Sequence, residues 1–268
     1  MNEVKKNKIY LSLAKVSSWT GLSRIFGLIR DVVTTNLLGA SVFHDIFVVT
    51  LKIPNLFRRF FAEGAFNQAF IPIYSDYQKG NDEKNTQEFI NSLAGSFLSI
   101  LFLFTILVLL ITPIFIFIFA PGFYYDDSKR IIAIDLLRIM FPYLALISLV
   151  SFASGIQNTH EKFSIPAFTP LIFNITLIVA AIFIAPIINL PVYALAWGVL
   201  IAGFLQLLIH IYALKNINRL PTPKINFSHP GQINVLKLMI PAILAGGIVQ
   251  INLLIDTIFA SLLQTGSP

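Results

Sequence analysis

Long apolar segments separated by short polar connections run through the whole sequence. A helix needs about 20 largely apolar residues to cross a hydrocarbon core of roughly 30 Å. Segments of this kind lie at 10–38, 42–66, 89–119, 131–157, 165–188, 191–214 and 235–264. The pattern therefore predicts an all-α polytopic membrane protein with about seven transmembrane helices.

The composition agrees with a bilayer as the solvent of most side chains. Of the 268 residues, 56% are hydrophobic and 12% are charged, and the mean hydropathy is +0.78. Soluble domains carry about 25% charged residues. The absence of cysteine excludes disulfides and thiolate metal sites. The first apolar segment contains Lys15, Arg24 and Asp31, so we do not expect a cleavable signal peptide.

The distribution of Lys and Arg over the connections predicts the orientation. Basic connections lie at 1–8, 75–88, 158–163 and 215–237, and neutral or balanced ones at 39–41, 120–130 and 189–190. Because basic connections stay in the cytoplasm, this alternation places the N-terminus inside and Pro268 outside. The net charge of +6 then belongs to cytoplasmic loops, and no nucleic-acid partner is expected.

The first predicted helix carries a polar stripe through an apolar surface. Spacings of three and four residues place polar residues on one helix face. These residues are Ser17, Thr20, Arg24, Gly27 and Asp31. Arg30 follows Ser23 by seven residues on a flanking face. The helix therefore presents two guanidinium groups at different angles.

The second predicted helix also carries a line of polar residues. They are spaced seven apart or lie close to that line, and they are Asp45, Lys52, Arg59, Asn55 and Glu63. Pro54 makes the register beyond it uncertain because proline disturbs the helix. Arg58 and Arg59 are therefore alternatives for the residue that points inward.

These charges are costly in lipid, and their sign predicts the ligand. An Arg or Lys near the middle of a lipid-facing helix costs roughly 2.5–3.5 kcal/mol, so we expect both charged faces to turn toward a shared water-filled cavity. The residues are Lys15, Arg24, Arg30, Lys52, Arg58 and Arg59 against Asp31, Asp45 and Glu63. The positive excess and the planar guanidinium groups favour an anionic, phosphate-bearing substrate.

Other interpretations of the same charges stay open. Arg24 with Asp31, or Asp45 with Lys52, could form ion pairs that only fix helix packing. Three cations near the predicted cytoplasmic interface could instead reach lipid phosphates; these are Lys15, Arg58 and Arg59, and this interpretation is favoured for Lys15 and Arg59. No Gly-rich phosphate loop, paired-His motif or nucleophile elbow occurs, so we expect no enzymatic activity, no cofactor and no metal site.

A short internal similarity links the first and last predicted helices. Asp31 to Leu38 reads DVVTTNLL and Asp256 to Leu263 reads DTIFASLL. The two helices are six spans apart, so they have the same predicted orientation, and parallel six-helix repeats are one standard transporter plan. We therefore expect a six-helix lobe at 1–220, followed at 221–268 by a cytoplasmic linker and the first helix of an incomplete second lobe.

Specific motifs are distributed along the whole chain. Those near the start are Ser23-Arg24-Ile-Phe-Gly27-Leu-Ile-Arg30-Asp31, Asp45, Pro54-Asn55-Leu-Phe-Arg58-Arg59-Phe-Phe-Ala-Glu63-Gly64-Ala65-Phe66 and Ala69-Phe70-Ile71-Pro72. The later ones are Ala120-Pro121-Gly122-Phe123, Phe141-Pro142-Tyr143, Phe163-Ser164-Ile165-Pro166, Asn174, Ala194-Leu195-Ala196-Trp197 and Pro241-Ala242-Ile243-Leu244. Together these motifs resemble the opening half of the MurJ (MviN) flippases, members of the multidrug/oligosaccharidyl-lipid/polysaccharide exporter superfamily, and the resemblance covers essentially the whole chain.

The resemblance implies a specific set of functional residues. The family's phosphate-binding arginines match Arg24, Arg30 and Arg58, its supporting acidic residue matches Asp45, and Glu63 matches a motif position. From the charge pattern we add supporting or gating candidates, which are Asp31, Lys52 and Asn55. Lys162 stands where the family has an arginine. The family's second lobe and its lipid-groove helices lie beyond Pro268.

The resemblance also implies the activity. The expected function is flipping of the peptidoglycan precursor lipid II from the inner to the outer leaflet of the bacterial plasma (inner) membrane by alternating access. The expected partners are lipid II and membrane lipids, with the peptidoglycan synthesis machinery as a further candidate. Alternatives are flipping of another polyprenyl-diphosphate-linked oligosaccharide, such as an O-antigen, and a membrane scaffold that transports nothing.

Overall fold

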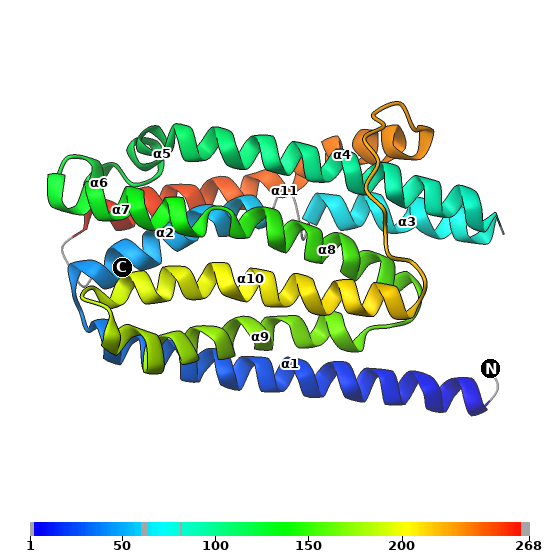
Figure 1. Ribbon diagram of the computed structural model, residues 1–268, viewed down its shortest axis with the longest axis horizontal. Coiled ribbons are helices and arrows are strands. Elements are labelled where there is room, and N and C mark those ends of the chain that lie inside the picture. Colours follow the sequence, from blue (N-terminus) through cyan, green and yellow to red (C-terminus); the bar gives the residue numbers. More distant parts are fainter. Residues whose placement is uncertain (1–2, 60–63, 81, 264–268) are drawn as a thin grey trace.

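The computed structural model describes residues 3–59, 64–80 and 82–263, and Figure 1 shows their arrangement. The α-helices are α1 Glu3–Leu38, α2 Val42–Arg58, α3 Ala65–Lys79, α4 Glu83–Leu110, α5 Thr112–Phe119, α6 Pro121–Tyr124, α7 Asp127–Met140, α8 Tyr143–Thr159, α9 Ser164–Val179, α10 Pro191–Asn216 and α11 Pro230–Leu262. A π-helical turn, η2 Ala180–Ile184, and a 3₁₀ turn, η3 Ala185–Ile187, extend α9. No strand occurs in these ranges, so the all-α class is confirmed.

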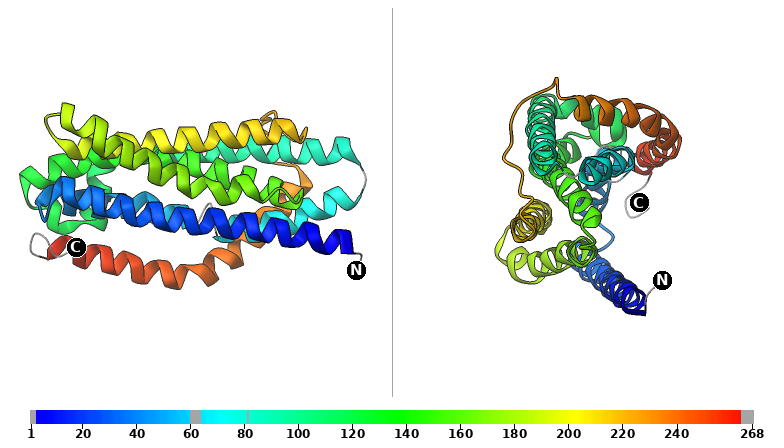
Figure 2. Two further views of the ribbon diagram at one scale, coloured as in Figure 1. Left: turned by 90° about the horizontal axis from the view of Figure 1, so that it is seen from below. Right: turned by 90° about the vertical axis from the view of Figure 1, so that its right-hand side faces the viewer.

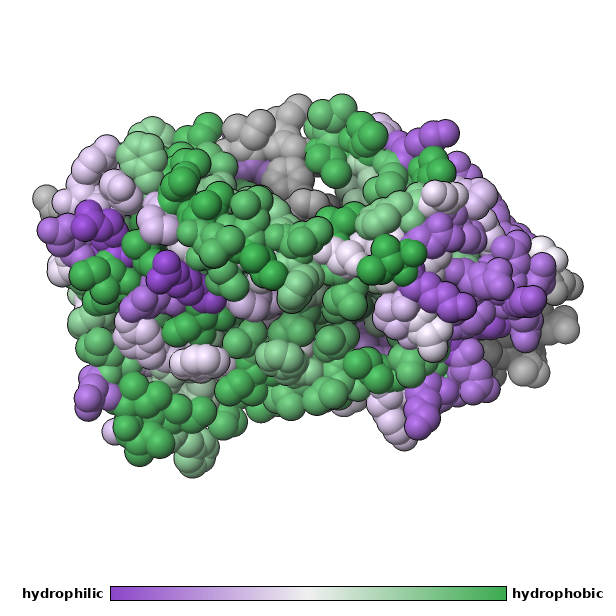
Figure 3. All heavy atoms as spheres, turned by 45° about the horizontal axis from the view of Figure 1, so that its top comes forward, coloured by the Kyte–Doolittle hydropathy of each residue, from purple (hydrophilic) through white to green (hydrophobic). Residues whose placement is uncertain are grey.

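The long helices run back and forth between two ends of the molecule. The start of α1 and the connections α3–α4, α8–α9 and α10–α11 lie at one end, on the right in Figure 1. Hydrophilic residues collect at this end, and apolar side chains cover the middle (Figure 3). The connections predicted to be basic therefore share one end. Helices α1 and α11 also run in the same direction (Figures 1 and 2), as the internal similarity predicts.

Four helical segments of the described chain are long and apolar enough to cross a membrane. They are Glu83–Leu110, Asp127–Thr159, Ser164–Ile187 and Pro191–Asn216. Each overlaps one predicted span. The predicted span 42–66 differs, because α2 is followed by a second helix, α3, that reaches Lys79. Only one face of α3 is apolar, with Phe66, Phe70 and Tyr74 buried. Average hydropathy therefore predicts that the helical region ends near residue 66, before α3 ends.

Two prolines divide predicted spans into shorter helices. Pro113 stands at the start of α5, where its missing N–H cannot bond to the carbonyl of Leu109. The hydroxyl of Thr112 donates to this carbonyl at 3.0 Å and to that of Val108 at 2.8 Å. Pro142 similarly lies between α7 and α8. Because the Leu109 carbonyl accepts a hydrogen bond from Thr112, the helix can be interrupted here even in an apolar environment.

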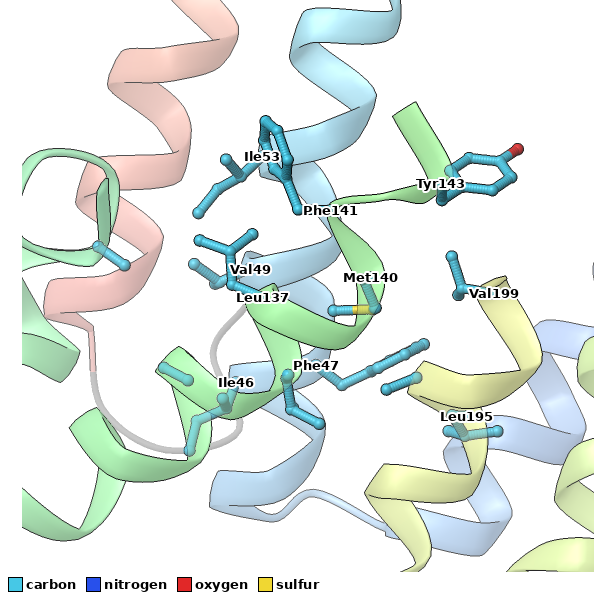
Figure 4. Packing of buried hydrophobic residues seen from close by; sticks show 14 of the residues in the cluster. Ile46, Phe47, Val49, Ile53, Leu137, Met140, Phe141, Tyr143, Leu195 and Val199 are labelled. Carbon is cyan, nitrogen blue, oxygen red and sulfur yellow. The ribbon is translucent and has the colours of Figure 1, made fainter. Parts of the chain in front are cut away.

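Two apolar clusters hold the bundle together. One joins α2, α7 and α10 through residues such as Ile53, Leu137 and Val199 (Figure 4). The other joins α3, α4, α8 and α11 and is rich in aromatic rings. Phe66 stacks on Phe97 with ring centroids 4.7 Å apart. Close-packed apolar side chains thus hold these helices in place relative to one another.

A buried histidine joins the three helices α8, α9 and α10. His210 is fully buried, and its two ring nitrogens lie 2.7 Å from Nε2 of Gln157 and 2.7 Å from Oγ1 of Thr169. The Gln157 amide donates to Nδ1, and Nε2–H donates to Thr169, whose hydroxyl donates to the carbonyl of Ile165 at 2.9 Å. A neutral imidazole satisfies all these bonds, so His210 is a structural residue here.

The connection between α10 and α11 lies along a polar strip of α4. The backbone N–H groups of Thr222 and Lys224 donate to Oδ1 and O of Asn91 at 2.8 and 2.9 Å. Ser92 donates to the carbonyl of Asn226 at 2.9 Å. A Cβ added to Gly95 would overlap the backbone of Lys224. Gly95 therefore allows this connection to lie directly on the helix. Helix α11 also packs on α3, α2 and α6, so it is in contact with helices that precede residue 220. The domain boundary at 220 stays a prediction.

Replacing Gly95 with alanine should destabilise the protein, because the new methyl group must displace the backbone of Lys224. Overpacking of this kind costs typically about 1–3 kcal/mol. Gly21, with open space around it on α1, is the matched control, and Gly21→Ala should be neutral or slightly stabilising. Thermal unfolding in detergent measures both variants. An equal melting temperature for the two would contradict this description of the α4 surface.

Acid should weaken the contact between α3 and the α8–α9 connection. His160 lies outside the candidate spans, with Nε2 at 2.9 Å from the Tyr74 hydroxyl and 2.7 Å from Nε2 of Gln78. Partial burial, with Arg219 and Lys162 nearby, lowers the pKa of His160 below its usual 6.5.

The folded protein therefore resists protonation of His160 more than the unfolded chain does. The stabilisation is present above pH 6.5 and is lost as the pH falls through the lowered folded pKa. His160→Asn should make the melting temperature less sensitive to a change from about pH 7.5 to about pH 5.5. The same sensitivity in parent and variant would contradict this.

Candidate functional site: a cationic cavity between α1, α2, α8 and α9

A cavity of about 800 Å³ lies between α1 on one side and α2 and α8 on the other, with α9 behind it. It is lined by both apolar and polar side chains. Its charged members are Arg30 and Asp31 from α1 and Lys52 and Arg58 from α2. Three cations thus face one carboxylate, and the cavity has an excess of two positive charges.

Three polar residues of the α2 wall stand in one line. Lys52, Asn55 and Arg58 follow each other at intervals of three and all line the cavity, because residues three apart share a helix face. Arg58 ends α2, and the following Arg59 is exposed. Of the two arginines that sequence left as alternatives, Arg58 is therefore the one in the cavity. Within the described residues, no carboxylate forms an ion pair with Lys52.

The α1 wall is centred on Arg30, whose side chain is 27% exposed. Its Nε and Nη2 donate to Oδ1 of Asp31 at 3.0 and 2.6 Å. Its Nη1 donates to Oδ1 of Asn174 on α9 at 2.9 Å. The guanidinium carbon also lies 5.8 Å from the ring centroid of Phe173, in the range of a cation–π contact. Arg30 is thus held by groups from two helices.

Two predicted site residues lie elsewhere, and a third falls outside the described residues. Arg24 is exposed on α1 and does not line the cavity. Asp45 is 6% exposed in the first turn of α2, where the helix dipole favours a carboxylate, and it does not line the cavity either. Glu63 lies outside the described residues. The predicted site residues that do line the cavity are Arg30, Arg58, Asp31, Lys52 and Asn55.

Neutral hydrogen-bonding groups occupy the α8 side of the cavity. Asn67 from α3 donates to the hydroxyl of Ser151 at 2.9 Å. Ser154 and Gln206 line the same space. In the described residues no group of three or more His, Cys, Asp or Glu could hold a metal ion. With its excess of positive charge and its neutral donors and acceptors, the cavity is suited to binding a large polar anion.

A second, smaller cavity of about 400 Å³ lies near the charged end of the molecule. Lys15 and Lys162 line it together with Glu161. Lys15 therefore lies at the same end as the α8–α9 connection, and its position at a membrane interface stays a prediction. This cavity does not include the residues that surround Arg30 and Arg58.

Sequence reasoning missed Asn174 and Phe173 as parts of the site. Asn174 is 6% exposed and bonds to Arg30 and to the carbonyl of Ser23. Its signal was present in the sequence, because it is an isolated amide in the apolar segment PLIFNITLIVA of α9. A buried polar residue in such a helix requires a partner. The neutral residues on α8 gave no such signal.

Comparison with known proteins agrees with this architecture. A family model described as lipid II flippase MurJ matches residues 34–268. A probable lipid II flippase MurJ of Buchnera aphidicola subsp. Acyrthosiphon pisum is 44% identical over 255 residues, which are 95% of this chain and 50% of that protein. The lipid II flippase MurJ of Burkholderia cenocepacia is 38% identical over 97% of this chain and 51% of its own length.

A solved structure titled lipid II flippase MurJ, inward closed conformation, has a similar fold. The TM-score is 0.78 and the sequence identity 29%, over 94% of this chain and 51% of that one. The chain thus spans about half the length of the curated relatives it matches. The family match and the apolar helices together indicate a multi-pass membrane protein. The chain belongs to the lipid II flippase MurJ family.

Proposed function

We propose that the cavity binds the diphosphate of lipid II and that the protein moves this lipid from the inner to the outer leaflet of the bacterial plasma membrane. The observation that carries the proposal is the placement of Arg30 and Arg58 on two helices around one cavity. Guanidinium groups bind phosphate oxygens through paired N–H donors. With Lys52, they give the cavity the sign of charge that a diphosphate requires.

The rest of the cavity suits the remainder of a lipid-linked headgroup. The neutral side chains near α8, among them Asn67 and Ser154, offer donors and acceptors for the hydroxyl and amide groups of a saccharide and peptide. Phe173, Val150 and Leu51 add apolar surface. Binding sites of this type combine many apolar contacts with few polar groups that fix orientation.

Transport requires the cavity to face one side of the membrane and then the other, and it breaks no bond. Helix α1 packs mainly on α9 and has few contacts with α2. A change in the spacing of α1 and α2 therefore breaks few contacts between these two helices, and we propose that the cavity opens and closes there. We infer that the basic end of the molecule, and with it the N-terminus, lies in the cytoplasm.

Arg24, Asp45 and Glu63 belong to the proposal through the sequence pattern and the family resemblance. Arg24 is exposed and Asp45 is buried, and neither lines the cavity. We propose that Arg24 meets the phosphates at another stage of transport and that Asp45 supports the start of α2. The division of the chain into a lobe at 1–220 and a following segment likewise stays part of the proposal.

Replacing Arg58 with alanine should weaken binding of a polyprenyl diphosphate by roughly 10- to 100-fold. This range follows from the loss of one hydrogen-bonded charge contact, worth about 1.5–3 kcal/mol. Arg59→Ala is the matched control, because it removes the same charge from the adjacent exposed position. Titration of the purified protein in detergent gives both Kd values. If Arg58→Ala binds as tightly as Arg59→Ala, the proposal is wrong.

The same titration tests the substrate class. Lipid II should bind more tightly than an undecaprenyl diphosphate that carries an O-antigen oligosaccharide, because only the former offers peptide amides to the neutral side of the cavity. A polyprenol without phosphate should not compete with either ligand. Competition by the polyprenol would instead indicate a site for the lipid tail and would favour a scaffold without transport.

A further inference from the structure

We propose that Asn174 is a positioning residue for the phosphate site: its amide holds Arg30 so that the remaining N–H groups of its two terminal nitrogens stay available to a ligand in the cavity. The inference deepens the proposed function and rests on it. Asn174 touches no substrate in this account and acts only through Arg30.

The amide of Asn174 bonds to α1 at two points. Its Oδ1 accepts from Nη1 of Arg30 at 2.9 Å, and its Nδ2 donates to the carbonyl of Ser23 at 2.9 Å. Ser23 and Arg30 are seven residues apart and so lie two turns apart on one face. Gly27 lies between them, and a Cβ there would stand 3.5 Å from Nδ2. One side chain of α9 therefore fixes both the backbone of α1 and its arginine.

The hydrogen bonds of Arg30 leave a defined pair of donors available. A guanidinium group has five N–H bonds. Nε and one N–H of Nη2 are used by Asp31, and one N–H of Nη1 is used by Asn174. Among the described residues, no further hydrogen bond of Arg30 occurs. One N–H on each terminal nitrogen thus remains, and each can donate to an oxygen of a phosphate.

Asn174 is the buried part of this arrangement. Asp31 is 63% exposed, and an exposed ion pair restricts a long side chain only weakly. Asn174 is 6% exposed and stands on a helix packed into the bundle. Without its amide, the guanidinium group would keep Asp31 and rotate with it toward solvent. Holding the guanidinium group in place before the ligand arrives reduces the ordering that binding would otherwise require.

A purely structural role makes a different prediction. If Asn174 only attached α1 to α9, any other contact between these helices would serve equally well. Trp19 provides that comparison, because its Nε1 donates to the Ser164 hydroxyl at 3.1 Å and its ring packs on Phe168 with centroids 4.8 Å apart. Trp19→Phe removes this hydrogen bond between α1 and α9 and does not touch Arg30.

A double-mutant cycle tests the proposal, with the Kd of a polyprenyl diphosphate as the readout. The variants are Asn174→Leu, Arg30→Gln and the two combined, with Trp19→Phe as control. Asn174→Leu should raise the Kd about tenfold, a typical coupling for residues in direct contact. The double variant should bind no more weakly than Arg30→Gln alone, and Trp19→Phe should bind like the parent. Asn174→Ala repeats the test without added bulk if the leucine variant does not fold.

The outcomes distinguish failure of the positioning role of Asn174 from failure of the proposed phosphate site. If Arg30→Gln weakens binding and the Asn174 variants do not, the proposed function stands and the positioning role is overturned. If the two effects add in full, Asn174 acts independently of Arg30 and the inference is again overturned. If Arg30→Gln leaves the Kd unchanged, the assignment of Arg30 to phosphate fails, and the inference fails with it.

Discussion

The need to keep charged side chains away from hydrocarbon shapes this molecule more than any other constraint. A lipid-facing Arg or Lys costs several kcal/mol near the middle of a helix, yet α1 and α2 carry Arg30, Lys52 and Arg58. The fold turns these side chains toward one cavity and gives Arg30 partners on α1 and α9. The surrounding helices can then be apolar outside, as the green band of Figure 3 shows.

The walls of the cavity are joined to the rest of the fold in different ways. Apolar clusters join α2 to α7 and α10, and α3 to α4, α8 and α11. Helix α1 packs mainly on α9 and has few contacts with α2. The α1–α9 interface includes hydrogen bonds of Trp19 and Asn174 and the packing of the Trp19 ring on Phe168. The α1 wall is thus held chiefly through α9, whereas the α2 wall is held by an apolar cluster.

Much of this architecture could be predicted from the sequence, and the failures have physical causes. Hydropathy located the spans around α4, α8, α9 and α10 because apolar length is what a bilayer selects. It missed α3, where only one face is apolar. The spacing of Lys52 and Asn55 correctly predicted one polar face of α2. Because Pro54 disturbs the helix, spacing alone could not predict that Arg58, rather than Arg59, lines the cavity. Asn174 was noted only as a motif residue, and its contact with Arg30 could not be predicted because the two residues lie 144 positions apart in the chain.

The most direct measurement is a structure of the protein with a bound polyprenyl diphosphate, determined at a resolution that locates phosphorus. The account predicts both phosphorus atoms inside the cavity, within hydrogen-bond distance of the terminal nitrogens of Arg30 and Arg58, and an unchanged bond from Arg30 to Asn174. Phosphates bound instead at exposed cations, such as Arg24 or the lysines of the charged end, with an empty cavity, would contradict it.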